Sequence, residues 1–146
     1  MNQSGVQSMT LFRNGRPQKL ITTDGYHHLF VTTTSGVTET YWIPGNASAP
    51  PTTWQVSSCA GTVGATTDQE VNGTFQTYTA TTSGVYETYW TPGTVSLNTG
   101  LLVSLSGVTG IVKDIEASGV NQLYTAAAGG TYESYWTPGA PGVTTG

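Results

Sequence analysis

The chain has 146 residues and a formal net charge of −4, with only 8% charged residues but 10% aromatic residues. Its length suits one domain, and its aromatic content argues against a disordered chain. The four Lys and Arg residues are too few for a phosphate-binding face, so we expect no nucleic-acid partner. No stretch approaches the roughly 18 apolar residues of a membrane helix, and we expect no membrane insertion.

The N-terminal segment leaves the compartment undecided. MNQSGVQSMTLF lacks the basic and then apolar run of a signal peptide, so a cytoplasmic protein and a secreted protein without a visible leader both remain open. Cys59 is the only cysteine, which excludes an internal disulfide. We expect it to be a small buried residue.

One hairpin sequence occurs three times along the chain. Residues 35–45 (SGVTETYWIPG) return at 83–93 (SGVYETYWTPG) and at 129–139 (GGTYESYWTPG). The similarity extends upstream of each copy, so the repeat is a unit of about 47 residues, a length typical of one four-stranded module. We therefore predict a single repeat domain over residues 1–146, with approximate units at 1–49, 50–97 and 98–146.

The second copy shows the expected strands most clearly. Residues 63–69 and 74–81 are rich in strand formers and flank an Asn-Gly turn, and residues 85–91 follow a Ser-Gly hairpin. Proline ends this last strand, since it cannot donate to a ladder. No segment has the apolar period of a helix, about 3.6 residues, so the sequence predicts an all-β fold.

Two architectures can be built from such units. A β-trefoil closes with three copies in one chain, as a monomer. A propeller blade is one four-stranded sheet, and a ring needs at least about four blades, so three blades cannot close it alone. We predict three four-stranded blades that form half of a six-bladed β-propeller, completed by homodimerisation, with the β-trefoil monomer as the alternative.

The two ends of the chain suggest how this ring closes. Residues 140–146 follow the third Trp-Thr-Pro-Gly without the strand that follows the other two copies, whereas residues 5–13 (GVQSMTLFR) are similar to the strands around Trp54 and Leu102. We expect the N-terminal strand 5–13 of one chain to close a terminal blade of its partner. A trimer with nine blades is the alternative assembly.

Glu39, Glu87 and Glu133 occupy one equivalent position in the three copies. The chain has only eight Asp and Glu residues, and a carboxylate among aromatic side chains is costly unless it is paired or reached by a ligand. In a structural interpretation each Glu accepts hydrogen bonds from backbone amides of the neighbouring blade. In a functional one it accepts two hydroxyl protons from a sugar.

Aromatic residues flank each glutamate. A few polar groups on an aromatic wall are typical of small concave sites, where the ring faces would meet the C–H side of a sugar. Core packing explains the tryptophans at least as well. The aromatic candidates for sugar binding are Trp42, Trp90, Trp136, Tyr41, Tyr89 and Tyr135.

The sequence gives no indication of catalysis. His27 and His28 are adjacent in the first repeat alone, and neighbours in a strand point to opposite faces, so they would not chelate one ion. The chain has no G-x-S-x-G elbow, no Gly-rich phosphate loop and no Cys/His cluster. We expect a protein that is not an enzyme, with no catalytic residues, cofactor or metal.

The hairpin with a Ser-Gly turn and the pattern Gly-x-x-Glu-x-x-Trp resembles the blades of the fucose-binding propeller lectins of fungi and soil bacteria. The likeness covers the central hairpin of each unit, a little under half of the chain. The resemblance implies that the three Glu bind sugar hydroxyls, that Trp residues stack on the ring, and that short chains assemble into a six-bladed ring. The position of the family's sugar-binding Arg is occupied here by His28, Gln76 and Gln122.

Two functions from different classes follow. The first is a multivalent carbohydrate-binding protein, a lectin with weak sites for glycans repeated around the propeller. The second is a non-catalytic structural or protein-interaction propeller, a fragment or an engineered repeat protein, without a native ligand. Binding to a glycan array discriminates between them.

Overall fold

The computed structural model describes residues 6–12, 25–70, 73–91, 94, 96–115, 118–137 and 142–146. All regular elements among them are β-strands, so the predicted all-β fold is confirmed. The strands form three antiparallel sheets of four strands each. The first sheet contains β1 (Val6–Phe12), β2 (His27–Thr33), β3 (Gly36–Trp42) and β4 (Thr52–Ser57).

The other two sheets repeat this up-and-down order. The second sheet contains β5 (Thr62–Gln69), β6 (Phe75–Thr81), β7 (Gly84–Trp90) and β8 (Asn98–Ser104). The third sheet contains β9 (Gly110–Ile115), β10 (Asn121–Ala127), β11 (Gly130–Trp136) and β12 (Thr144–Thr145). Each sheet is therefore one meander, and every described strand pairs only within its own sheet.

The central hairpins explain the repeated Ser-Gly sequence. Thr81 Oγ1 accepts a hydrogen bond from the Ser83 amide at 3.3 Å, which fixes the turn between β6 and β7. Gly84 follows with a φ of 155°, and a Cβ there would collide with the Val103 carbonyl on β8. Glycine is needed because β8 approaches the turn so closely.

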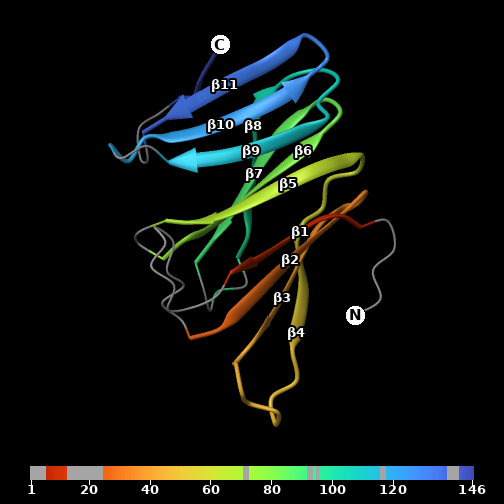
Figure 1. The fold of residues 1–146 in the computed structure, drawn as a ribbon, viewed down its shortest axis with the longest axis vertical. Helices are drawn as coiled ribbons and strands as arrows, with labels where there is room; N and C mark the ends of the chain where they lie inside the picture. The colour runs from red at the N-terminus through yellow and green to blue at the C-terminus, as the bar shows by residue number, and fades with distance from the viewer. Residues whose placement is uncertain are drawn as a thin grey trace.

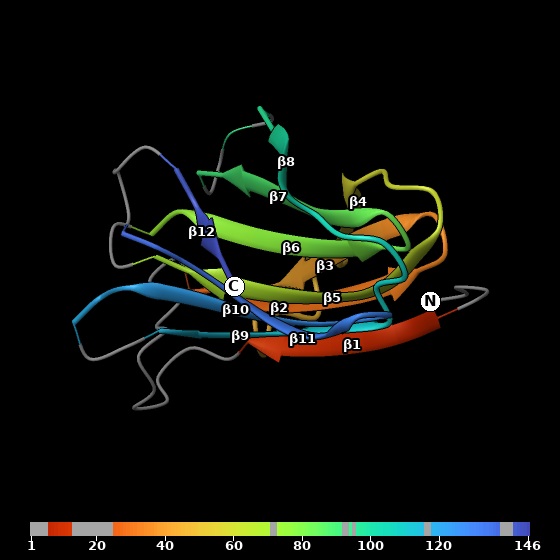
Figure 2. The ribbon, with the colours of Figure 1, turned by 90° about the horizontal axis from the view of Figure 1, so that it is seen from above.

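The three sheets lie in a row and pack face to face (Figure 1). β5 lies against β1 and β2 on one side and against β9 on the other, so the first strands of the three sheets are neighbours. Seen from above, the sheets overlap along this row (Figure 2). The second sheet is thus covered on both faces, while the first and the third each have one face that no other described sheet covers.

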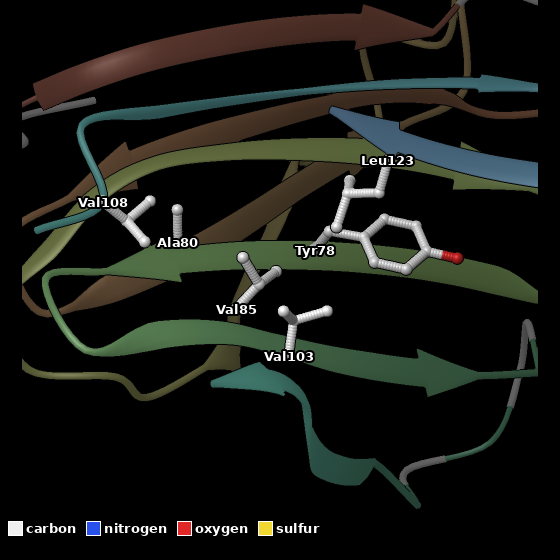
Figure 3. Close-up of a cluster of buried hydrophobic side chains, with 6 residues drawn as sticks. All are labelled: Tyr78, Ala80, Val85, Val103, Val108 and Leu123. Carbon is white, nitrogen blue, oxygen red and sulfur yellow. The ribbon is translucent and has the colours of Figure 1, made fainter. Parts of the chain in front are cut away.

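Apolar side chains fill both spaces between sheets. Phe30, Val37 and Val56 of the first sheet pack against Phe75 and Trp90 of the second. The second cluster joins the second and third sheets (Figure 3); it comprises Tyr78, Ala80, Val85, Val103, Val108 and Leu123. This burial between sheets provides the main stabilisation of a chain that contains so few charges.

Polar contacts cross the same two spaces. Thr79 Oγ1 on β6 donates to Ser57 Oγ on β4 at 2.9 Å. Lys113 on β9 forms an ion pair with Asp68 on β5, where burial lowers the pKa of Lys113 to about 8. Buried polar groups of this kind are paired because an unpaired one would cost stability.

Two expectations about the chain ends are corrected by the strand pairing. β1 pairs with β2 of its own chain, from Val6 opposite Thr33 to Phe12 opposite His28, and is the edge strand of the first sheet. Residues 142–146 are not without a strand, because β12 pairs with β11. A single chain thus already contains four strands in each sheet, and no sheet lacks a strand for the partner's residues 5–13 to supply.

The trefoil alternative does not describe this chain. A trefoil requires one closed barrel with strands from different repeats paired to one another. The described strands form three separate sheets and no closed sheet. The prediction of an all-β chain with three four-stranded sheets is confirmed, while ring closure and homodimerisation stay predictions.

Candidate functional site

The three glutamates lie at the same place in their sheets, on the third strand. Glu39 is flanked by Phe30 and Trp54 on the neighbouring strands, and Glu87 is flanked by Tyr78 and Gly100. Glu133 lies opposite Tyr124 and exchanges two backbone hydrogen bonds of 2.9 Å with Gly146. We call the side of each sheet that carries its glutamate the Glu face.

The other predicted residues divide between two faces. Directly opposite residues of an antiparallel pair share a face. Tyr41, Tyr89 and Tyr135 lie on the Glu face, as do their partners His28, Gln76 and Gln122. Trp42, Trp90 and Trp136 lie on the opposite side, which we call the Trp face. The structure therefore brings the Glu, Tyr and His or Gln positions together and separates the tryptophans from the glutamate of their own sheet.

Two of these tryptophans pack in the spaces between sheets. Trp90 contacts Phe30 of the first sheet with ring centroids 6.1 Å apart, and Trp136 contacts Tyr78 of the second sheet at 5.7 Å. Each Trp face thus packs on the Glu face of the preceding sheet. Core packing accounts for Trp90 and Trp136, and Trp42 packs edge-on against His27 on the uncovered face of the first sheet.

Glu39 is sealed inside the protein. His28 Nδ1 lies 2.6 Å from one carboxylate oxygen, and the Trp54 indole N–H donates to the other. The residue is only 2% exposed. Both oxygens are occupied by side chains, so in the first sheet this glutamate stabilises the fold and has no access to a ligand.

Glu87 instead lines an open pocket of about 490 Å³ on the second sheet. Gly100 on β8 has no side chain, and the space above its backbone is free. The lining residues are Glu87, Tyr89, Leu97, Asn98, Thr99, Gly100, Leu101 and Leu102. The absence of a side chain at position 100 leaves open the volume that the Trp54 indole fills in the first sheet.

The environment of Glu87 changes its acidity. Partial burial raises the pKa of this carboxyl, and the neighbouring Tyr78 hydroxyl acts in the opposite direction. Burial also raises the pKa of the Tyr78 hydroxyl, which donates to Gln76 Oε1 at 2.7 Å. The second sheet therefore keeps a costly, partly desolvated carboxylate next to a space that a polar ligand can enter.

Glu133 lies on the Glu face of the third sheet. Gln122 Nε2 donates to its Oε1 at 3.0 Å, and the Tyr124 hydroxyl donates to the same oxygen at 3.4 Å. The carboxylate is half-buried, and the nearby Tyr135 ring is exposed. This third copy therefore has the same polar groups as the site of the second sheet.

Trp54 and Gly100 are the site residues that the repeat spacing misses. The 48-residue step between Trp42 and Trp90 places Leu102 at the position of Trp54, but the ladders place Gly100 there. The cause is the connection between β3 and β4, which is two residues longer than that between β7 and β8. Gly61 and Gly64 recur 46 residues later as Gly107 and Gly110, and this step, applied to Trp54, leads to Gly100.

Other kinds of site find no support in the described part of the chain. There, no group of three His, Cys, Asp or Glu side chains is arranged to hold a metal ion. None of the described segments is a helix long and apolar enough to cross a membrane. Cys59 is buried, as its sequence context predicts, and its sulfur lies 3.4 Å from Ser57 Oγ.

Comparison with protein-family models and with curated proteins finds no match to this sequence. The resemblance to the fucose-binding propeller lectins therefore stays a prediction that rests on the hairpin pattern. The function has to be argued from the geometry of the site.

Proposed function

We propose that the protein is a non-catalytic carbohydrate-binding protein whose main site is the pocket above Gly100. The observation that carries the proposal is a partly desolvated carboxylate, Glu87, at an open pocket of about 490 Å³ beside an exposed tyrosine ring. Natural small-molecule pockets fall in the range of roughly 300–1,000 Å³. The volume is sufficient for a monosaccharide unit.

The chemistry of the lining suits a sugar. An ionised carboxylate accepts hydrogen bonds from two adjacent hydroxyl groups, and Glu87 has this capacity. The exposed face of Tyr89 offers an apolar surface for the C–H side of the ring, and Asn98, directly opposite Tyr89 on the same face, adds a polar group. Such an open site supports a dissociation constant of roughly 0.1–1 mM, or about −4 to −5.5 kcal/mol.

The three repeats contribute unequally to this function. Glu133, with Gln122 and Tyr135 on the same face, forms a second candidate site. Glu39 takes no part as ligand, because His28 and Trp54 occupy its oxygens. His28 and Gln76 stand where the resembling lectins have an Arg, so we propose a site without a cationic partner for the glutamate.

Calorimetric titration with a panel of monosaccharides, including fucose, galactose, mannose and glucose, tests the proposal. We expect saturable binding by the wild type and at least a tenfold loss in Glu87→Gln. Glu39→Gln is the matched control and should retain binding, provided circular dichroism shows that it is folded. The absence of saturable binding to this panel and to a glycan array would refute the carbohydrate proposal.

We also propose that two chains complete a six-bladed propeller, with a nine-bladed trimer as the alternative. The repeated face-to-face packing of the three sheets, with their first strands adjacent, supports this arrangement. Several weak sites around one ring would bind a glycan-covered surface with high avidity. Light scattering should give twice the chain mass of 15.3 kDa.

The second candidate function is a structural or protein-interaction propeller without a native ligand. The sealed state of Glu39 favours it, since it shows that this repeat position can be purely structural. The two candidates separate on the glycan array. A scaffold gives no signal that depends on Glu87, whereas a lectin gives signals that fall in Glu87→Gln.

A further inference from the structure

The two spaces between sheets are built in the same way. In each, the Trp face of one sheet packs on the Glu face of the sheet before it. Trp90 lies on Phe30, and Trp136 lies on Tyr78. Phe30 and Tyr78 stand directly opposite Glu39 and Glu87, so the contact is centred on equivalent positions in both cases.

The row of sheets ends in two faces of opposite kind. No described sheet covers the Glu face of the third sheet, which carries Val112, Tyr124 and Tyr135, half of the large exposed hydrophobic residues of the described chain. The Trp face of the first sheet carries Trp42, which no described residue of another sheet contacts in a ring pair. The third sheet thus exposes a Glu face and the first sheet exposes a Trp face, and these are the two kinds of face that pack together inside the row.

The exposure of equivalent residues indicates which part of the open face is built for contact. Tyr78 is 0% exposed beneath the third sheet, while its equivalent Tyr124 is 38% exposed. Tyr89 remains 44% exposed although the third sheet is in place, and its equivalent Tyr135 is 45% exposed. A sheet added to the third one would therefore bury Tyr124 and leave Tyr135 as it is.

We propose that the Glu face of the third sheet binds the Trp face of the first sheet of a second copy of this chain. The partner's Trp42 then packs on Tyr124 as Trp136 packs on Tyr78. The contact is head-to-tail, so two copies form two identical contacts and close a ring around a twofold axis. This inference rests on the proposed six-bladed assembly and replaces exchange of the N-terminal strand as its mechanism.

Light scattering of matched arginine variants tests the contact. The wild type should have twice the mass of one chain, and Tyr124→Arg should have the mass of one chain, 15.3 kDa. Tyr135→Arg introduces the same residue on the same sheet at similar exposure and should keep the mass of the wild type. Tyr124→Ser, which removes the ring without adding charge, should also weaken the assembly, and circular dichroism verifies that each variant is folded.

Mixing two defective variants tests the head-to-tail geometry. Trp42→Arg damages the first sheet and leaves the third intact, whereas Tyr124→Arg does the reverse. Each should be a single chain alone, and their equimolar mixture should form a two-chain species through the one undamaged contact. A symmetric contact between like faces, or an exchange of strands, gives no such complementation.

The outcomes are separable from those of the carbohydrate proposal. A wild type with the mass of one chain, or a Tyr124→Arg variant that keeps the mass of the wild type, overturns the contact. A mass of three chains keeps the contact and overturns the six-bladed ring. Sugar titration of the single-chain Tyr124→Arg variant tests the Glu87 pocket independently, because that pocket lies within one chain.

Discussion

The first and second sheets place the same glutamate in opposite situations. Glu39 is enclosed by His28 and Trp54, and both of its oxygens are bonded. Glu87 lies beside Gly100, which leaves a pocket at the same position of the repeat. The difference shows that the residues on the two neighbouring strands decide whether a repeated carboxylate holds the fold together or faces an accessible space. The first sheet has His28 and Trp54 at these positions, and the second has Gln76 and Gly100.

The largest expected effect is on stability, at the sealed glutamate. Glu39→Ala leaves the His28 and Trp54 donors buried without an acceptor and should cost roughly 3 kcal/mol of unfolding free energy. Glu87→Ala should cost less than about 1 kcal/mol, since its removal exposes fewer unsatisfied groups. Urea denaturation measures both, and equal losses in the two variants would contradict the contrast between the sheets.

Removing the Trp54 side chain should create a pocket beside Glu39 in the first sheet. Trp54→Gly removes a half-buried indole and one donor to Glu39, and we expect a loss of about 2–3 kcal/mol, below the usual cost for a fully buried tryptophan. The vacated space should resemble the pocket above Gly100. Calorimetry on the folded variant should then show one additional sugar site per chain, and an unchanged stoichiometry would mean that the pocket needs more than the glycine.

Filling the pocket beside Glu87 in the second sheet should abolish sugar binding there. Gly100→Trp introduces at this position the side chain that occupies the first sheet, and nothing lies within 4 Å of the added Cβ. We expect sugar binding to fall at least tenfold, about 1.4 kcal/mol, with little change in stability. Gly146→Trp, at the equivalent position of the third sheet, is the control and should leave the second-sheet pocket and its binding intact.

The smallest expected effect is a dependence on pH. Only the ionised carboxylate accepts two hydroxyl protons, so binding is present above the pKa of Glu87 and is lost as the pH falls through it. Because burial raises this pKa above the ordinary 4.5, the loss should begin at a higher pH than for an exposed glutamate. Titrations across the acidic range check this, and an affinity independent of pH would show that Glu87 does not contact the ligand.

The repeat and the strand content could be predicted because they are local properties of the sequence. The spacing of Gly36 and Trp42, repeated at Gly84 and Trp90, defines each central hairpin. The partner of the N-terminal strand could not be predicted, since a strand's own sequence does not specify the edge on which it pairs. Thus residues 5–13 were expected to serve a partner chain, whereas β1 lies on the first sheet of its own.

The candidate site was predicted in part. The alternation of side chains already places Glu87 and Tyr89 on one face and Trp90 on the other. Whether the carboxylate is sealed or open depends on the residue opposite it on the fourth strand of the sheet, β4 or β8. The repeat spacing misplaces that residue because the connection between β3 and β4 is two residues longer than the connection between β7 and β8. A shift of this size cannot be read from a repeat spacing measured on a different strand.

The most direct measurement is an amide and indole NMR titration of the wild type with the monosaccharide that binds best in calorimetry. We expect saturable shifts at the Gly100 and Tyr89 amides and none at the Trp54 indole N–H, which remains bonded to Glu39. Shifts at the Trp54 indole with an unperturbed Gly100 amide would contradict it, because they would place the ligand at the carboxylate that the structure seals.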